Sequence, residues 1–211
     1  MQGVLRLVLF SLLLPPGSLL ECETCSATSS NCTGSWEICE NNLDSCAISL
    51  MVLSQGEKPY TTVEKGCYSF SNCSAGWILV TFGREKFIRQ SVGCCQEQDC
   101  TLPQLPPINT TANGKRCPAC YAAPHACPTA IVNCTGFENY CLGLTMHQHG
   151  GKAISLKGCT TELTCEELQA GEKAFLGVDV RGEKIDCRPA SQTSSLSGSF
   201  LLCLLLMMVL L

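Results

Sequence analysis

Short runs of apolar, β-branched and aromatic residues, separated by clusters of turn-forming residues, recur along this chain. Such runs predict β-strands, and the Gly- and Pro-containing clusters between them predict hairpin turns. The predicted strands are Ala47–Leu53, Tyr60–Val63, Trp77–Phe82, Phe87–Val92, Leu142–His147, Ala153–Lys157, Ala174–Val180 and Ile185–Cys187. The predicted turns are Ser54–Pro59, Gly83–Lys86, Gln148–Lys152 and Arg181–Lys184. No stretch of ten residues shows sustained helical periodicity, so the pattern predicts an all-β fold of short antiparallel hairpins.

The spacing of the cysteines shows an internal duplication. Gaps of two, six, six and six residues between successive cysteines begin at Cys22 and begin again at Cys117. A Lys-Gly-Cys sequence, five further residues and another cysteine then end at Cys73 in the first block and at Cys165 in the second. Chance does not plausibly reproduce these shared spacings, so one cysteine-rich module is used twice.

Composition places the chain among disulfide-stabilised proteins of an oxidising compartment. It has 19 Cys in 211 residues, and modules of this size bury too little apolar surface to be stable without covalent links. Each disulfide typically contributes about 2–4 kcal/mol, and such bonds persist outside the cytosol. Charged residues make up only 15% and the net charge is −4, which gives no indication of a nucleic-acid partner.

Both ends of the chain have the composition of processing signals. Arg6 and the apolar run Leu7–Leu14 are typical of a secretory signal peptide, and the run is too short for the alternative, a signal anchor. After Arg188 a small, polar segment precedes the apolar residues 200–211. This order is typical of a glycosylphosphatidylinositol (GPI) attachment signal, and the alternative is an apolar tail on a soluble protein. The expected attachment residue is Ser191 or Ser194.

These features together predict the domain organisation. We expect a signal peptide at 1–19, a first module of ten cysteines at 20–101, a linker at 102–115, a second module of eight cysteines at 116–188 and a GPI-attachment signal at 189–211. The linker contains three Pro and is short, so we expect the modules to touch. Removal of Cys203 with the apolar tail leaves an even number of cysteines in each module.

The cysteine pattern resembles the Ly-6/urokinase-receptor domain family. The residues that carry the resemblance are the C-x2-C opening at Cys22, the long interval from Cys46 to Cys67, and the ending Cys94-Cys95-x4-Cys100. The resemblance covers about 20–188 and implies two tandem three-finger (snake-toxin-like) domains, all-β and disulfide-rich. Members of the family bind proteins through their fingers and are not enzymes.

The resemblance also implies the disulfide partners, which the sequence alone leaves open because ten cysteines allow hundreds of connectivities. The implied pairs are Cys22–Cys46, Cys25–Cys32, Cys39–Cys67, Cys73–Cys94, Cys95–Cys100, Cys117–Cys141, Cys120–Cys127, Cys134–Cys159 and Cys165–Cys187. Two features depart from the family pattern: Thr101 stands where Asn is usual, and the second module lacks the final disulfide.

The arrangement of ten and then eight cysteines, with a Pro-rich linker and an Asn113-Gly114 step, is similar to the gamma-type phospholipase A2 inhibitors of serum. Two-domain GPI-anchored members of the family, which include sperm and leukocyte surface proteins, are also similar. The resemblance therefore implies either a secreted inhibitor or a protein of the outer cell surface.

Residues with catalytic or metal-binding chemistry are few. His147 and His149 stand two residues apart on a predicted strand and turn, but two ligands without a third make a weak metal site, and an exposed polar finger tip is the simpler interpretation. The C-x2-C pairs at Cys25 and Cys120 suit zinc or redox chemistry in other contexts, whereas here they indicate structural disulfides. No nucleophile elbow, zinc-protease motif or phosphate loop is present, and we expect no cofactor and no catalysis.

Four sequons predict glycosylation, at Asn31, Asn72, Asn109 and Asn133. Asn109 lies in the linker and is the best acceptor, because at the other three a cysteine occupies the middle position and disulfide formation competes. For protein binding we expect residues on the second and third fingers, of types that interfaces favour. The candidates are Met51, Lys58, Tyr60, Trp77, Arg84, Met146 and His147.

The function predicted from the sequence is that of a GPI-anchored surface glycoprotein. It would bind an extracellular protein ligand or receptor in adhesion or signalling, and it would contact the membrane through its lipid only. The alternative is a secreted inhibitor of phospholipase A2. An extracellular hydrolase has no residues to support it.

Overall fold

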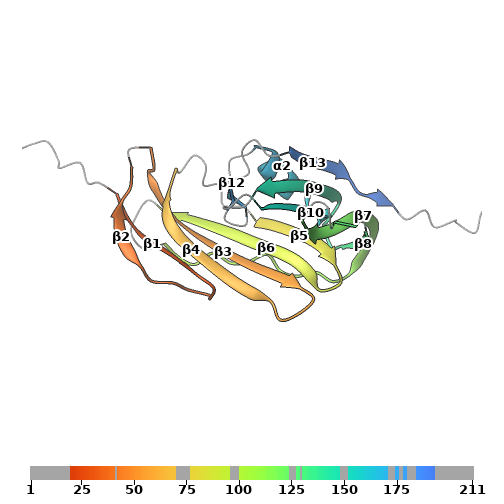
Figure 1. Ribbon diagram of the computed structural model, residues 1–211, viewed down its shortest axis with the longest axis horizontal. Helices are drawn as coiled ribbons and strands as arrows, with labels where there is room; N and C mark the ends of the chain where they lie inside the picture. The colour runs from red at the N-terminus through yellow and green to blue at the C-terminus, as the bar shows by residue number, and fades with distance from the viewer. Residues whose placement is uncertain are drawn as a thin grey trace, which may run out of the picture. The chain divides into compact units, whose positions relative to one another are not determined.

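A computed structural model describes residues 20–40, 42–69, 77–95, 100–123, 127–128, 130–147, 152–170, 174–175, 178–179 and 184–192 (Figure 1). Its strands are β1 (Glu21–Ala27), β2 (Ser35–Ile38), β3 (Ser45–Gln55), β4 (Tyr60–Tyr68), β5 (Trp77–Gly83), β6 (Lys86–Cys95), β7 (Ala112–Ala122), β8 (Ala130–Thr135), β9 (Tyr140–His147), β10 (Ala153–Thr160), β11 (Ala174–Phe175), β12 (Val178–Asp179), β13 (Lys184–Pro189) and β14 (Ser191–Gln192). One helix, α2 (Glu162–Ala170), is also described. The predicted all-β, disulfide-rich fold of three-finger type is therefore confirmed.

Seven of the eight predicted strands correspond to observed strands, namely β3, β4, β5, β6, β9, β10 and β13. The exception is Ala174–Val180, where the prediction of one strand is wrong. β11 and β12 pair with each other there, with Ala174 opposite Asp179, so a hairpin closes inside the predicted strand. Residues 181–183 of the turn predicted after it lie outside the described residues.

Helix α2 was not predicted from the sequence. Thr161 caps its first turn, because its Oγ1 accepts a hydrogen bond from Thr164 N at 3.2 Å. Only Thr164, Cys165 and Leu168 are buried, and the helix is nine residues long. A buried stripe of three residues is too short to produce a recognisable period of 3.6.

The expected linker is also shorter than the prediction, since β7 begins at Ala112 and the last four residues of 102–115 lie in a strand. The guanidinium of Arg89, on β6, donates a hydrogen bond to the carbonyl oxygen of Pro106. Pro106 is itself buried. The linker is therefore held against the third finger of the first module rather than free in solvent.

The chain forms two compact units whose boundaries do not coincide with the two cysteine modules. The first unit comprises Met1–Leu50, Thr62–Ala75 and Val92–Pro103, and the second comprises Met51–Thr61, Gly76–Ser91 and Gln104–Leu211. The distal parts of the second and third fingers of the first module therefore belong to the same unit as the second module.

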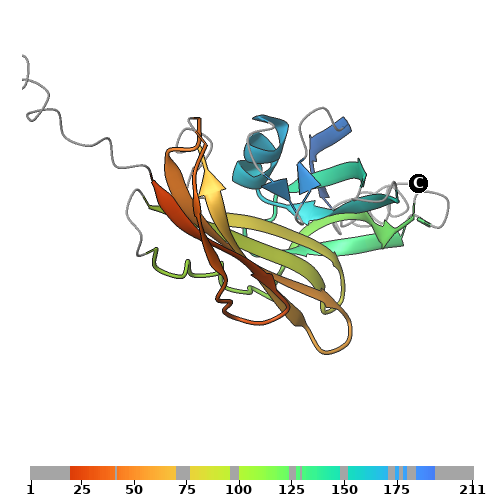
Figure 2. The same ribbon diagram turned by 60° about the vertical axis from the view of Figure 1, so that its left-hand side comes forward.

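Sulfur dominates the interior of the first unit. β1 pairs antiparallel with β2 and with β4, and Figure 2 shows strands β1–β4 in red to orange. The buried cluster consists of Cys22, Cys39 and Cys46, with Leu20, Leu43, Cys67, Cys95 and Cys100 packed against it. Lys65 Nζ and the Glu23 carboxylate form an ion pair at 2.6 Å across β4 and β1. Disulfides therefore supplement the few buried aliphatic side chains of this unit, Ile48, Leu50 and Val63.

The second unit has an aliphatic core to which both modules contribute. β10 pairs with β9, with β7 and with β5, and β9 also pairs with β13. Buried residues of the first module's fingers are Leu53, Ile78, Val80, Phe82 and Ile88, and buried aliphatic residues of the second module are Leu142, Leu144, Met146, Leu156 and Leu168. Burial of these apolar side chains from both modules stabilises this unit.

The pairing of β5 with β10 joins the two modules inside the second unit. Thr81 lies opposite Cys159 and Val80 opposite Thr160. Thr160 Oγ1 donates a hydrogen bond to Leu79 O at 2.6 Å. A Cβ added at Gly158 would lie 2.4 Å from the carbonyl oxygen of Thr81, closer than any side chain allows. Only glycine at this position lets the two strands approach to hydrogen-bonding distance.

Helix α2 reinforces the same junction through one buried hydroxyl. Thr164 Oγ1 donates to Trp77 O at 3.2 Å and accepts from Leu79 N at 3.4 Å, and its side chain is fully buried. Both partners are backbone groups of β5, so α2 satisfies polar groups on the strand that the first module contributes. Figure 1 shows α2 beside β9 and β13 of the second module.

Glu138 is a buried carboxyl in the same unit, only 1% exposed. Its Oε2 accepts hydrogen bonds from Thr135 N and Thr135 Oγ1, both at 2.9 Å, while its Oε1 has no partner of normal geometry among the described residues. Burial raises the pKa of Glu138 above its ordinary value, against weaker lowering contributions from Thr81 and Thr135. Folding therefore favours the protonated carboxyl more than the unfolded chain does.

Eight disulfides are described, and each joins the partners that the family resemblance implies. They are Cys22–Cys46, Cys25–Cys32, Cys39–Cys67, Cys95–Cys100, Cys117–Cys141, Cys120–Cys127, Cys134–Cys159 and Cys165–Cys187. The Cα–Cα separations suit disulfide bonding, from 5.3 Å for Cys117–Cys141 to 6.0 Å for Cys25–Cys32. Cys73, the expected partner of Cys94, lies outside the described residues.

The internal duplication supplies a matched pair of substitutions that tests the β5–β10 junction. We expect Gly158→Ala to lower the free energy of unfolding by at least about 1–3 kcal/mol, because the new methyl group would collide with backbone. Gly66 occupies the equivalent position in the first module, and a Cβ there would meet nothing within 4 Å. Gly66→Ala should therefore leave the melting temperature nearly unchanged. Equal melting temperatures for the two variants would contradict the close approach at Gly158.

Glu138→Gln tests the buried carboxyl through the pH dependence of stability. A folded-state pKa above the unfolded value of 4.5 means that the stabilising contribution is complete below pH 4.5 and is lost as the pH rises through the folded-state pKa. The melting temperature of the Gln variant, relative to the parent protein, should therefore rise between pH 4 and pH 8. The exposed Glu57, changed to Gln, is the control and should show a much smaller trend. A difference that does not vary with pH for Glu138→Gln would contradict the assignment.

Candidate binding surfaces

The structure divides the residues predicted to bind a partner into core and surface. Met146 is 0% exposed, so its prediction as a binding residue is wrong. It lies on the inward face of β9, where strand alternation places every second side chain. Met51 is half-buried and packs against the same aliphatic core. Both methionines therefore act mainly as core residues.

The other predicted binding residues have exposed side chains. Tyr60 is 43% exposed and Trp77 is 49% exposed, and Lys58, Arg84 and His147 are also exposed. His149, considered with His147 as a metal ligand, lies outside the described residues. These exposed residues come from different fingers.

Tyr60 lies near an aromatic pair of the second unit. The rings of Phe82 and Tyr121 lie 5.3 Å apart between centroids, at an angle of 33°. Burial raises the pKa of Tyr121, and the nearby Tyr60 raises it further. Tyr60 itself is 43% exposed, so much of its ring remains accessible to a partner.

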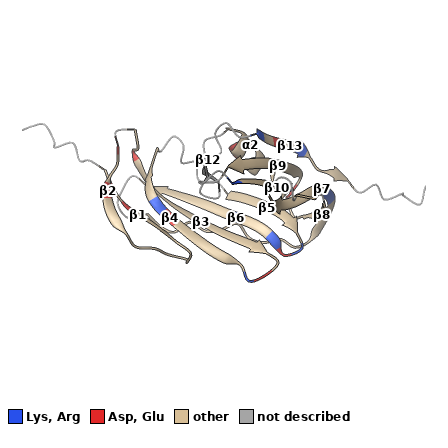
Figure 3. Ribbon diagram, in the orientation of Figure 1, with Lys and Arg blue, Asp and Glu red and all other residues tan. Residues whose placement is uncertain are grey.

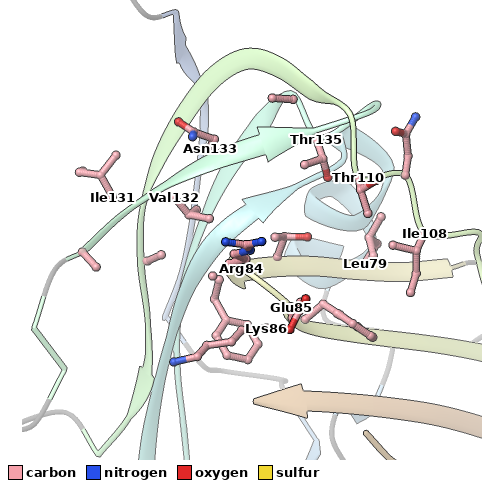
Figure 4. A pocket seen from close by; sticks show the side chains of 18 residues that line it. Leu79, Arg84, Glu85, Lys86, Ile108, Thr110, Ile131, Val132, Asn133 and Thr135 are labelled. Carbon is pink, nitrogen blue, oxygen red and sulfur yellow. The ribbon is translucent and has the colours of Figure 1, made fainter. Parts of the chain in front are cut away.

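The described residues of the second unit line a large pocket, which we call the Arg84 pocket. Its volume is about 980 Å³, and it lies wholly within the second unit, between the β5–β6 hairpin, residues 108–112, β7 and β8. Figure 4 shows Arg84 between Val132 on one side and Leu79 on the other, with Ile131 and Ile108 farther out. Three charged residues line it, namely Arg84, Glu85 and Lys86.

The hairpin tip that carries these charges has a constrained backbone. Glu85 has a φ of 56°, in the left-handed region that non-glycine residues rarely adopt. Ser54 Oγ donates a hydrogen bond to Glu85 O at 2.5 Å, which holds the tip of the third finger against the end of β3. Arg84 has no acidic partner among the described residues. The cationic groups are therefore presented on a fixed turn. Figure 3 shows basic and acidic residues interspersed rather than segregated.

Two predicted glycosylation sites also line this pocket. Asn109 and Asn133 are both exposed, so their side chains are accessible. Asn109 Oδ1 accepts a hydrogen bond from Thr111 N at 2.9 Å, and Asn133 Oδ1 accepts one from Arg116 Nε at 3.1 Å. Asn31 is exposed in the first unit, and Asn72 lies outside the described residues. Glycosylation at all four remains a prediction.

A second exposed surface lies in the first unit and was not anticipated from the sequence. All four residues of β2 are exposed, and Trp36 and Ile38 are 52% and 56% exposed. β2 pairs only with β1 among the described strands, so its other edge has unpaired backbone groups. We call Trp36, Ile38 and this free edge the β2 surface. Alternation of Ser, Trp, Glu and Ile was the available signal, but the run is only four residues long.

Two groups of three sulfurs lie close enough together to resemble metal sites. They are Cys22, Cys39 and Cys67, and Cys117, Cys134 and Cys159, with the ligand atoms of each group within 4.8 Å of one another. All six cysteines are in disulfides, so none offers the thiolate that zinc requires. Both groups are parts of the disulfide clusters.

The expected GPI attachment region is partly described. Ser191 lies in β14 and pairs with Arg116 on β7, and Ser194 lies outside the described residues. Ala190, just before β14, is buried and its N–H donates to Asn139 O at 2.8 Å. Among the described residues, no helix is long and apolar enough to cross a membrane.

Comparison with known proteins finds relatives that share one description, phospholipase A2 inhibitor. A sequence model of the family described as phospholipase A2 inhibitor matches residues 20–102. A phospholipase A2 inhibitor of the gamma type from Gloydius brevicaudus siniticus is 29% identical over 203 residues, which cover 92% of this chain and all of the relative. A gamma-type inhibitor from Laticauda semifasciata is 30% identical over 186 residues, which cover 83% of this chain and 99% of the relative.

Among solved structures, mouse TEX101 matches with a TM-score of 0.41 and 16% identity, and the match covers 82% of this chain and all of that one. The relatives from Gloydius and Laticauda are inhibitors by name, and this chain is likewise not an enzyme. From the identity and coverage of these relatives, the chain belongs to the phospholipase A2 inhibitor family.

Proposed function

We propose that this protein binds a secreted phospholipase A2 and inhibits it. The observation that carries the proposal is that relatives bearing this description match both cysteine modules in order, over 83–92% of this chain. The alternative function given by the sequence is thus better supported than surface adhesion or signalling. Inhibition requires only a protein surface that blocks the enzyme.

We place the enzyme-binding contact on the β2 surface. The family match covers residues 20–102, which contain β2, and this strand presents the exposed Trp36 and Ile38. Tryptophan is among the residues that contribute most to protein–protein binding, and a free strand edge adds backbone hydrogen-bonding groups. The Lys65–Glu23 ion pair and the disulfides of Cys22 and Cys25 hold β1, and thereby fix β2, before binding.

The repeated cysteine frame supports a more distant relationship. We propose that both modules are Ly-6/urokinase-receptor domains, the second without its last disulfide. The support is the cysteine spacing that the two modules share at their start, and the finger-like hairpins β3–β4, β5–β6 and β9–β10. In that relationship the disulfide frame is shared, while the exposed residues of the fingers differ between members.

Inhibition provides the first test of this function. The secreted protein, at micromolar concentration, should reduce the hydrolytic rate of at least one member of a panel of secreted phospholipases A2. Trp36→Ala should weaken this inhibition about tenfold or more, because loss of a central anchor costs about 2 kcal/mol. Inhibition constants measured with a soluble substrate would give both values.

The second tryptophan is the matched control. Trp77 is exposed to a similar degree but belongs to the second unit, so Trp77→Ala should leave inhibition unchanged. If Trp77→Ala weakened inhibition and Trp36→Ala did not, the enzyme-binding contact would not lie on the β2 surface. Failure to inhibit any enzyme of the panel would overturn the proposed function itself.

A GPI anchor is the second proposal, and it is compatible with binding at a cell surface. The observation that favours it is the composition after Arg188, which is uncharged, first small and polar and then apolar. Because Ser191 and Gln192 pair with β7, an attachment residue beyond them disturbs the fold least. Of the two expected residues, Ser194 is therefore favoured over Ser191.

Treatment of cells that express the full chain with phosphatidylinositol-specific phospholipase C tests the anchor. We expect the protein to be released from the cell surface, with a C-terminal peptide that ends at Ser194 and carries an inositol-glycan remnant in mass spectrometry. Protein recovered from the medium of untreated cells, without such a remnant, would instead establish a secreted form. That outcome would remove the anchor and leave the proposed inhibition intact.

A further inference from the structure

The walls of the Arg84 pocket leave apolar surface accessible on two sides. Ile131 is 63% exposed and Ile108 is 51% exposed, on β8 and in the linker, respectively. Leu79 and Phe87 of the hairpin and Val132 of β8 complete the apolar lining. Apolar surface costs about 25 cal/mol per Å² to leave in water, so a ligand that covered these side chains would gain that free energy.

Arg84 adds a specific charge to this apolar surface. Figure 4 shows its guanidinium directed into the cavity, between Val132 and Leu79. It has no acidic partner among the described residues, and Lys86 is a second cation of the lining. With Glu85 as the only acid of the lining, the charge of the pocket is positive. A guanidinium beside apolar walls favours a carboxylate, which it binds with two parallel hydrogen bonds.

The size of the cavity restricts the ligand further. A volume of about 980 Å³ is at the upper end of the range for small-molecule sites, which is about 300–1,000 Å³. This volume is larger than a small carboxylic acid would fill, and it can hold a long hydrocarbon chain. An anionic head with one long apolar chain therefore fits the pocket in both charge and polarity.

We propose that the Arg84 pocket binds a long-chain fatty acid. The carboxylate would lie on the guanidinium of Arg84, with Lys86 adding positive potential, and the hydrocarbon chain would extend past Val132 and cover Ile131. The site belongs to the second unit and the β2 surface to the first, and the inference does not rest on inhibition of phospholipase A2. The pocket would thus take a lipid ligand, in addition to the protein ligand expected for the β2 surface.

Binding of a fluorescent fatty acid, cis-parinaric acid, to the intact secreted protein tests the inference. We expect saturable binding that oleate displaces and that methyl oleate, which has the same chain without the charge, displaces at least tenfold less well. Arg84→Gln should raise the Kd about tenfold or more, because a charged hydrogen bond contributes about 1.5–3 kcal/mol. Ile131→Gln should also raise the Kd, because it removes apolar contact between this wall of the pocket and the hydrocarbon chain.

Lys152→Gln is the control for charge, since Lys152 is an exposed cation that does not line the pocket. Its Kd should equal that of the parent protein. Absence of saturable binding would overturn the inference, as would equal displacement by methyl oleate or an unchanged Kd for Arg84→Gln. Displacement by lysophosphatidic acid but not by oleate would replace the carboxylate with a phosphate ligand and would also overturn it. No enzyme is present in this assay, so its outcome is separate from that of the inhibition test.

Discussion

The close approach of β5 to β10 is the contact on which the second unit depends. Gly158 has no side chain, and so the carbonyl oxygen of Thr81 occupies the space that a Cβ would need. This approach brings a strand of the first module into the sheet of the second, and Val80 thereby enters the shared aliphatic core. The equivalent Gly66 meets nothing at that distance. One glycine of the repeat thus serves module assembly, while its duplicate has no such role.

The two units are stabilised by different interactions. The first relies on buried cystines around Cys22, which restrict the unfolded chain, and its surface strand β2 contributes almost nothing to the interior. The second combines four disulfides with buried aliphatic side chains from both modules. Because β2 is not needed for burial, its residues are free to vary with the binding partner. The disulfide frame therefore constrains the fold strongly and the contacts of β2 weakly.

The sequence predicted those features that depend on local pattern. Apolar β-branched runs located β3, β5 and β9. By contrast, β1 and β7 were missed because they consist largely of Cys and small or polar residues, and β2 and β8 because their apolar patterns are short. Nine residues are too few for α2 to show a helical period. Met146 was misjudged because the pattern cannot tell which alternate face of β9 is covered. The Arg84 pocket and the burial of Glu138 arise from contacts between residues distant in the chain, and no local signal encodes them.

The separation of the two candidate surfaces into different units has a functional consequence. Substitutions on β2 and substitutions in the Arg84 pocket have no partners in common, so their effects on binding should be independent unless the ligands themselves are coupled. The predicted glycosylation sites Asn109 and Asn133 line the pocket. Glycans there would restrict access by a large protein far more than access by a single hydrocarbon chain. This difference in size favours a small ligand for the pocket and a protein ligand for the β2 surface.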